Sequence, residues 1–307
     1  MFLKSLLSLL FGLPKNSAII VYQGGLGNQL FQYLLGRELQ KVFKKNVIYY
    51  DIRKYYKKNH KSDIQNLFQL KLRKYNIDKS NFLVKFILLS PLFLRFNKFV
   101  FQKLKIKIFS NYFFDNNNKP IILENFKNND NLLIFFGTWH NLINQYIYSK
   151  NIKNLKFKNI NLPKNYNFQK KFISLHVRRG DYCDPKTSNF HGNLNLNYYL
   201  SAIEFLRNKF GNIPVLLFSD DTEWISKNLS YLIKNSIVIS SLKSSPEIDF
   251  YIMSKANYFI LSNSTFAWLS AFLSEKKDKF VVLPKYWFKN EKINSYHIYK
   301  DWKYEVI

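Results

Sequence analysis

The regular alternation of apolar runs and helix-like segments in the second half of the chain most constrains its fold. Strands are expected over residues 172–177, 215–218, 237–239, 258–261 and 280–283. Helices are expected between them, over residues 198–210, 246–255 and 266–274, with a further helix through Trp224. This alternation favours a mostly parallel, doubly wound α/β sheet, in which ligands bind at the carboxyl ends of the strands.

The first half opens with a strand, a glycine-rich loop and a helix. Residues 18–22 are an apolar run, residues 23–28 form the loop, and residues 29–43 place apolar side chains near the 3.6-residue period. Further strands are expected over residues 47–50 and 132–136. The first half of the chain therefore forms an α/β domain of its own, N-terminal to the one in the second half.

Helices are also expected in the middle of the chain, around residues 82–101 and 143–148. The polar segment over residues 151–167 is the best candidate for a linker. We therefore divide the chain into two domains, over residues 1–160 and 161–307.

The chain is strongly basic, with 47 Lys and Arg against 20 Asp and Glu and a formal net charge of +27. Between residues 37 and 107, 19 basic residues accompany 4 acidic ones and are interleaved with aromatics. Such a segment suits contact with acidic lipid headgroups or an anionic glycan. A general compositional bias toward Lys, Asn, Ile, Phe and Tyr explains the charge equally well. No recognised nucleic-acid motif accompanies it, so no nucleic-acid partner is expected.

The apolar N-terminal segment, residues 1–14, is too short to cross a bilayer as a helix, which takes about 20 residues. It lacks the small-residue cleavage site of a signal peptide, so we expect an interfacial anchor or a capping helix. Cys183 is the one cysteine, which excludes an intrachain disulfide and fits a reducing compartment. The histidines are scattered, and no zinc-type cluster is present in the sequence.

Two adjacent arginines, Arg178 and Arg179, follow the strand over residues 172–177. Guanidinium groups are rarely buried without a paired anion, and their planar donor fork fits phosphate oxygens two at a time. We therefore expect a strand-end site for a phosphate-bearing ligand. A surface salt bridge with Asp181 is the competing interpretation. His176 is either a core histidine bonded to the backbone or a contact for a nucleobase or phosphate.

Polar residues also follow two other expected strands. Asp220 and Asp221 come after the strand over residues 215–218, where they cap a helix or contribute to the ligand site. Ser264 and Thr265 start a helix whose unpaired N–H groups favour an anion. They cap that helix, bind phosphate, or do both.

The glycine loop of the first half contains Gly25 and Gly27 but lacks the third glycine of a dinucleotide fingerprint, because Leu30 stands in that place. Asn28, at the expected helix start, is a good N-cap, and its amide can also meet a substrate hydroxyl or phosphate. A tight turn without a ligand explains the glycines equally well.

Four segments together resemble the bacterial α-1,2-fucosyltransferases, glycosyltransferase family 11. They are the glycine loop and helix start over residues 24–33, the double-arginine motif over residues 176–182, Phe218-Ser219-Asp220-Asp221, and Ser262-Asn263-Ser264-Thr265-Phe266-Ala267-Trp268. Gly137-Thr138-Trp139 is similar to a Gly-Tyr-Trp segment of that family, with Thr in place of Tyr. The double-arginine motif is shared with the wider α-1,2, α-1,6 and protein O-fucosyltransferases, whereas Gln-Phe-Gln-Tyr after the glycine loop is typical of the α-1,2 branch.

The resemblance implies a GT-B fold: two Rossmann-like doubly wound domains facing each other across a cleft. Residues 1–160 would form the acceptor-side domain and residues 161–307 the domain that binds the GDP-sugar donor. It implies inverting transfer of L-fucose from GDP-fucose to O2 of a terminal galactose on a glycan, as by a galactoside 2-α-L-fucosyltransferase of surface polysaccharide or lipopolysaccharide synthesis. GDP-fucose is then a co-substrate, and neither a cofactor nor a metal is expected.

By motif position, the resemblance implies that Arg178 and Arg179 neutralise the GDP diphosphate. It places these further residues at the donor: Gly25, Gly27, Asn28, His176, Asp220, Asn263, Ser264, Thr265 and Phe266. Asn28 is expected to face the fucose or the β-phosphate. The candidate catalytic residues are Arg178, Arg179, Asn28, His176 and Asp181. The sequence does not identify a general base, for which His176, Asp181 and His140 are candidates.

Two other functions stay open: a transferase that uses another GDP-sugar, and a non-catalytic binder of an anionic polymer. The expected location is the cytoplasm, with peripheral contact at the anionic inner face of the cytoplasmic membrane. The sequence leaves open which glycan is the acceptor and which of the two arginines meets the β-phosphate.

Overall fold

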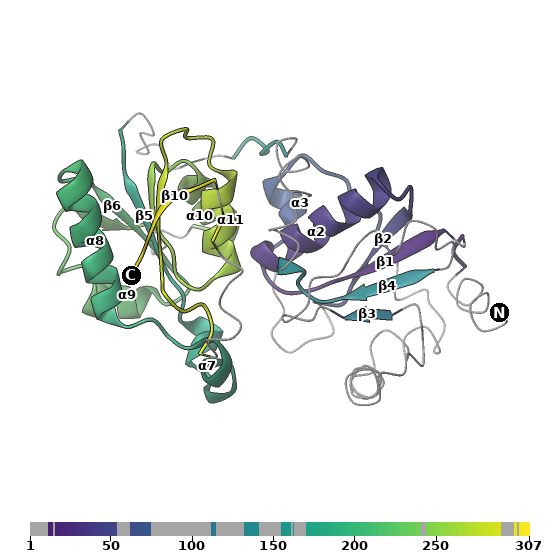
Figure 1. Cartoon of the computed structure of the whole chain (residues 1–307), viewed down its shortest axis with the longest axis horizontal. Coiled ribbons are helices and arrows are strands. Elements are labelled where there is room, and N and C mark those ends of the chain that lie inside the picture. Colours follow the sequence, from purple (N-terminus) through teal and green to yellow (C-terminus); the bar gives the residue numbers. More distant parts are fainter. Residues whose placement is uncertain are drawn as a thin grey trace. The chain divides into compact units, whose positions relative to one another are not determined.

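The computed structural model describes residues 12–14, 16–53, 62–74, 112–114, 132–140, 155–160, 162, 170–240, 244–289, 298–299 and 301–307. The chain divides into two compact units (Figure 1). The first comprises Met1–Lys61 and Leu70–Leu155, and the second comprises Ser62–Gln69 and Lys156–Ile307. The helices predicted around residues 82–101 and 143–148, and residues 1–11 of the apolar N-terminal segment, lie outside the described residues.

The first unit is built on a four-stranded parallel sheet in the order β2-β1-β4-β3. Its elements are β1 (Ser17–Tyr22), α2 (Leu26–Lys41), β2 (Asn46–Asp51), β3 (Tyr112–Phe114) and β4 (Leu133–Phe136). Strand β1 is buried along its whole length, as expected of a central parallel strand covered on both faces. The strands predicted over residues 18–22, 47–50 and 132–136 are confirmed, whereas β3 was not predicted.

Helix α2 begins three residues earlier than the predicted helix, at Leu26. Its N-cap is Gly25, which makes no side-chain hydrogen bond, so the prediction that Asn28 caps this helix is wrong. Gly24 has a φ of +78°, which glycine adopts at little cost. A Cβ added to Gly24 would meet Asn28 Nδ2 at 2.6 Å. The left-handed glycine thus turns the chain early and leaves room for the Asn28 side chain above it.

The second unit is built on a six-stranded parallel sheet in the order β10-β9-β8-β5-β6-β7. Its strands are β5 (Ile173–Val177), β6 (Val215–Ser219), β7 (Ser236–Val238), β8 (Tyr258–Ile260), β9 (Phe280–Leu283) and β10 (Lys303–Val306). This is the strand order of a Rossmann sheet: the chain runs from β5 outward to β7, returns to β8 on the other side of β5, and runs outward to β10. The switch point therefore lies between β5 and β8. Ligands of such sheets bind at that switch point, at the carboxyl ends of the strands.

The second unit also contains helices in its described residues, and the last four of those that follow alternate with the strands as predicted. They are α3 (Ile64–Leu67), α7 (Pro185–His191), α8 (Leu196–Phe210), α9 (Thr222–Asn228), α10 (Pro246–Ser254) and α11 (Thr265–Leu273). The side chains of Asn195, Asp221, Ser245 and Ser264 cap the last four, each accepting a hydrogen bond from a backbone N–H of the first turn. Helices α3 and α7 and strand β10 were not predicted.

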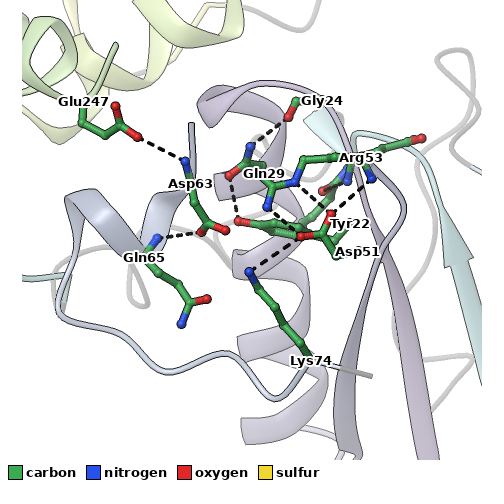
Figure 2. Close-up of polar contacts among 11 residues, drawn as sticks. Tyr22, Gly24, Gln29, Asp51, Arg53, Asp63, Gln65, Lys74 and Glu247 are labelled. Atoms are coloured by element: carbon green, nitrogen blue, oxygen red, sulfur yellow. Dashed lines mark hydrogen bonds and ion pairs between the residues drawn. The ribbon is translucent and has the colours of Figure 1, made fainter. Parts of the chain in front are cut away.

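A short segment of the first half of the chain, Ser62–Gln69, belongs to the second unit. Asp63 caps α3 by accepting from Gln65 N at 2.9 Å, and its own N–H donates to Glu247 at 3.2 Å (Figure 2). Phe68 pairs with Phe157 in an antiparallel bridge, and their rings lie 4.8 Å apart. The linker predicted over residues 151–167 is described only at residues 155–160 and 162, where Phe157 makes this contact.

Gly36 lets helix α2 approach the sheet of the first unit. A Cβ added there would overlap the Tyr49 hydroxyl and meet Ile20 Cδ1 at 2.8 Å. Gly36→Ala should therefore destabilise the first unit by about 1–3 kcal/mol, the usual cost of overpacking. Urea denaturation would measure this, with Gln40→Ala, on the exposed face of the same helix, as the control. Equal stability of the two variants would contradict the close packing.

Candidate active site

Arg178 is held between two carboxylates immediately after β5. Its Nη2 donates to Asp181 Oδ1 at 2.5 Å, and its Nη1 lies 2.8 Å from Asp220 Oδ2. Its guanidinium also lies over the Tyr182 ring, 5.3 Å from the centroid. Burial opposes the charged form, but Asp220 and Asp181 outweigh it and raise the pKa of Arg178. Arg178 is thus a fixed, permanently charged group at the switch point.

Arg179 points to a different set of partners. Its backbone N–H donates to Asp220 Oδ1 at 2.9 Å, and its Nε donates to Asp221 Oδ2 at 3.2 Å. The guanidinium carbon lies 4.4 Å from the centroid of the Trp224 ring, a cation–π contact that also orients the group. Among the residues that the structure describes, neither terminal nitrogen of Arg179 makes a hydrogen bond.

Asp220 occupies the space beside Gly180. A Cβ added to Gly180 would overlap the Asp220 carboxylate and lie 3.0 Å from its Cγ. The glycine therefore allows Asp220 to reach the backbone of Arg179. The next turn is fixed by Tyr182, whose hydroxyl donates to the carbonyl oxygen of Asn263 at 3.0 Å. This bond joins the loop after β5 to the loop after β8.

His176 is a buried member of β5 with a side-chain partner. Its Nδ1 lies 2.7 Å from Ser262 Oγ, and its ring lies 5.5 Å from that of Phe266. Burial, reinforced by the charge of Arg178, lowers the pKa of His176 to about 3. The imidazole is therefore neutral at physiological pH and ties β5 to the residue after β8.

The loop after β8 is held in place by Asn263, which is 1% exposed. Its Nδ2 lies within hydrogen-bonding distance of the carbonyl oxygens of His191 (2.9 Å), Gly192 (3.1 Å) and Trp287 (3.2 Å). Ser264 then caps α11, its Oγ accepting from Phe266 N at 3.3 Å. The other N–H groups of this first turn, including that of Thr265, are suited to an anion.

A chain of hydrogen bonds behind the arginines begins at Asp249 in α10. Asp249 accepts from Ser240 Oγ at 2.6 Å and from Ser244 Oγ at 2.5 Å. Ser240 Oγ in turn accepts from Ser219 N at 3.1 Å, and Ser219 Oγ accepts from Asp221 N at 2.9 Å. Burial raises the pKa of Asp249, although the two serine hydrogen bonds oppose the shift. The chain connects a buried carboxyl group to the end of β6.

In the first unit, Asn28 and His140 meet at the carboxyl ends of β1 and β4. His140 Nε2 lies 3.2 Å from Asn28 Oδ1, and the imidazole lies 4.8 Å from the Phe31 ring. These two strands are adjacent and parallel in the sheet. Gly25 and Gly27 lie in the same turn as Asn28, at the N-terminus of α2.

Tyr22, at the end of β1, connects the glycine loop to a charged cluster (Figure 2). Its hydroxyl donates to Gln29 Oε1 at 2.8 Å, and Gln29 Nε2 donates to the Gly24 carbonyl oxygen at 2.8 Å. The Arg53 guanidinium carbon lies 4.9 Å from the centroid of the Tyr22 ring. Asp51 holds Arg53 through both carboxylate oxygens, at 2.9 and 2.6 Å, and these contacts lower the pKa of Asp51 against the effect of burial.

The structure thus brings together Arg178, Arg179, Asp181 and Asp220 in one ion-paired cluster. The end of the neighbouring strand β8 carries Ser262, which contacts His176, and then Asn263, Ser264, Thr265 and Phe266. Gly25, Gly27 and Asn28 belong to the first unit. Sequence reasoning missed the roles of Trp224, Tyr182, Asp249 and the buried glutamines of α2. Trp224 carried a signal, because it lies on the first turn of the helix that Asp221 was predicted to cap.

In the described part of the chain, no group of three or more His, Cys, Asp or Glu residues is arranged to hold a metal ion. Within the same residues, no helix is long and apolar enough to cross a membrane.

These features define an α/β protein with parallel sheets and an arginine-containing site at the switch point of a Rossmann sheet. The family model described as glycosyl transferase family 11 matches residues 17–306, so the chain belongs to that family. This confirms the resemblance inferred from the motifs. With two Rossmann-like units, it also confirms the predicted α/β fold of the GT-B type.

Curated relatives agree with this family. An α-1,2-colitosyltransferase from Escherichia coli is 29% identical over 294 residues, which make up 89% of this chain and 93% of the relative. The O-antigen biosynthesis glycosyltransferase WbnK of Escherichia coli is 39% identical over 116 residues, 38% of each chain. The galactoside 2-α-L-fucosyltransferase SEC1 of Bos taurus is 26% identical over 105 residues, 34% of this chain and 28% of the relative.

Acid should destabilise the second unit through His176. Its pKa is lowered from 6.5 to about 3 by burial and by Arg178. Between these pH values the unfolded chain binds a proton that the folded chain does not. His176 therefore contributes a decrease in unfolding free energy of up to about 1.4 kcal/mol for each pH unit of acidification. Urea denaturation across this range should show a smaller pH slope in His176→Gln. An unchanged slope would contradict the neutral buried histidine.

Replacing Asp249 should loosen the end of β6. In Asp249→Asn one of the two serine hydroxyls loses its acceptor, so we expect a destabilisation of about 1–3 kcal/mol. Backbone hydrogen exchange at Ser219 should also become faster, because its N–H bonds to Ser240 Oγ. Asp278→Asn, at an exposed position, is the matched control. Ser219 exchange that is the same in both variants would count against the hydrogen-bond chain.

Proposed function

We propose that this chain is an inverting glycosyltransferase that moves L-fucose from GDP-fucose to a glycan hydroxyl, O2 of a terminal galactose. Its family membership supports sugar transfer. The α-1,2 linkage is supported by two relatives, an α-1,2-colitosyltransferase and a galactoside 2-α-L-fucosyltransferase. The second unit would bind the donor and the first unit the acceptor.

The observation that carries the proposal is the arginine pair at the β5 end, next to the α11 N-terminus. Strands β5 and β8 are neighbours, so the loop with Arg178 and Arg179 and the loop with Ser264 emerge side by side. Arginines and helix N-termini are the two groups that proteins most often use for phosphate. A nucleoside diphosphate sugar has two phosphates and thus fits both at once.

The two arginines are already paired with carboxylates, so the donor's phosphates would have to exchange with those carboxylates. The two guanidinium groups face three carboxylates, those of Asp181, Asp220 and Asp221. The cluster therefore does not attract anions by net charge. A diphosphate would instead first bind the terminal nitrogens of Arg179, and would then replace part of the carboxylate contacts of the two guanidinium groups. Exchange of this kind favours a ligand with bidentate oxygens over a single small anion.

In the proposed reaction, the bond between the anomeric carbon and the β-phosphate oxygen breaks as the acceptor oxygen attacks from the opposite side. Negative charge grows on the departing GDP. A guanidinium fixed beside that oxygen stabilises the transition state more than the ground state. The ion pairs of Arg178 hold it in place before the donor arrives, which avoids reorganisation during the reaction.

A second candidate donor is GDP-colitose, in which the sugar is the 3-deoxy form of fucose. It is favoured by the relative that matches along most of the chain, which is an α-1,2-colitosyltransferase. The two donors share the GDP moiety and differ in one sugar hydroxyl. The arginine site would therefore serve both, and the choice between them would depend on contacts to the sugar.

The name of WbnK, an O-antigen biosynthesis glycosyltransferase, supports a role in building surface polysaccharide. We place the acceptor among such glycans. The basic stretch between residues 37 and 107 supports peripheral contact of the enzyme with anionic lipid at the cytoplasmic face of the membrane.

The arginine variants test the proposal. Incubated with GDP-fucose or GDP-colitose and a panel of β-galactosides, the wild-type protein should release GDP and form an α-1,2-linked product. Arg178→Ala and Arg179→Ala should each lower the transfer rate by about 10²–10³-fold, from the loss of one transition-state contact. Lys227→Ala is the control, since Lys227 is an exposed cation of α9 that pairs with Glu223.

Thermal shift measurements distinguish a protein that binds GDP from one that binds UDP. GDP should stabilise the protein by an amount that grows with the logarithm of its concentration above the Kd, and UDP should not. Stabilisation by UDP alone, or full transfer activity in both arginine variants, would overturn the proposal.

A further inference from the structure

Arg179 is held through its Nε atom and through one face of its guanidinium group. The Nε donates to Asp221 Oδ2 at 3.2 Å, and the guanidinium carbon lies 4.4 Å from the centroid of the Trp224 ring. Within the described residues, Nη1 and Nη2 make no hydrogen bond, and the side chain is 23% exposed. The group is therefore oriented by two partners while its terminal nitrogens stay accessible to a ligand.

One carboxylate fixes both Arg179 and the ring that it lies over. Asp221 Oδ2 accepts from the arginine Nε, and Asp221 Oδ1 accepts from the backbone N–H of Trp224 at 2.9 Å. The second of these bonds caps α9. The backbone N–H of Asp221 in turn donates to Ser219 Oγ at 2.9 Å. The indole and the guanidinium are thus both tied to the end of β6.

The Trp224 side chain is supported by the core of the second unit. It is partly buried and packs against the apolar cluster formed by side chains of β5, β6, β8, β9 and α8. Its carbonyl oxygen accepts from Asn228 Nδ2 at 2.9 Å. The other four tryptophans are between 1% and 6% exposed. Trp224 therefore lies at the margin of the core, where it packs inward and supports a charged group.

The cation–π contact leaves the donors of Arg179 unused, which distinguishes this arginine from its neighbour. Both terminal nitrogens of Arg178 face carboxylates, those of Asp181 and Asp220. A phosphate that approaches Arg178 must displace one of them. A ring contacts the face of a guanidinium, whereas hydrogen bonds to phosphate lie in its plane. Trp224 can therefore hold Arg179 without competing with a phosphate.

We propose that Trp224 is a positioning residue for the sugar donor, whose ring holds the Arg179 guanidinium so that Nη1 and Nη2 bind phosphate oxygens of a nucleoside diphosphate. The inference rests on the proposed function and extends it to a residue that touches no substrate. A long side chain that is ordered before the ligand arrives loses less freedom on binding, which strengthens the complex. Arg179, Asp221 and Trp224 all belong to the second unit.

Replacing the ring tests the proposal. Trp224→Leu keeps an apolar side chain against the core but removes the π face. GDP carries the negative charge that the departing nucleotide develops, so its Kd reports the contact. We expect this Kd, measured by titration calorimetry, to rise about 3–30-fold, the range that a cation–π contact contributes. Trp224→Phe keeps a weaker π face and should give a Kd between those of wild type and Trp224→Leu.

Two comparisons separate positioning from a loss of structure. Tyr231→Leu removes an aromatic ring that is 70% exposed just after α9, and it should bind GDP as the wild type does. Guanosine has no phosphate, so Trp224→Leu should bind it within about twofold of wild type. A guanosine Kd that rises by the same factor as the GDP Kd would mean that the replacement disturbs the whole site, and would overturn the positioning role.

A double-mutant cycle tests whether Trp224 acts through Arg179. In Arg179→Ala the ring has no guanidinium to hold, so adding Trp224→Leu should change the GDP Kd by less than about twofold. Effects of the two replacements that multiply would overturn the proposal. A wild-type protein that binds no GDP would contradict the proposed function itself, whereas normal GDP binding with multiplying effects would refute only the role of Trp224.

Discussion

The double contact of Asp220 is the interaction on which the arginine site depends. Its two carboxylate oxygens hold the Arg178 side chain at 2.8 Å and the Arg179 backbone N–H at 2.9 Å. The register of the sheet explains the pairing: Val177 lies opposite Ser219, so the residues that follow, Arg178 and Asp220, leave adjacent strands side by side. One carboxylate thereby fixes both arginines at once, and their different directions follow from the alternation of side chains along an extended chain.

This arrangement explains why a glycine follows the arginines. Asp220 reaches the Arg179 N–H only by passing over the Cα of Gly180, where any Cβ would overlap the carboxylate. The glycine is thus required by a close approach, since its φ lies outside the left-handed region. Burying Arg178 is tolerable because two carboxylates face it, and removal of either would leave a partly desolvated charge with one partner. The loop and its ion pairs therefore form a single unit.

Strand and helix periodicity allowed most of the second unit to be predicted, because each parallel strand is a short apolar run closed by polar residues. Strand β10 was not predicted because its exposed edge position gives it no apolar run. The start of α2 was misplaced since a left-handed Gly24 ends the loop earlier than the polar residues suggest. The buried roles of Gln29 and Gln32 were not predictable either. Amides in a helix usually mark its exposed face, and only the tertiary fold shows that backbone groups of two loops surround them.

The strand ends of the two sheets hold their loop residues by different chemistry. At the ends of β5 and β6 the groups are held by ion pairs, which we propose a diphosphate exchanges in part. At β1 and β4 they are held by neutral amides, through Gln29, Gln32 and Asn28.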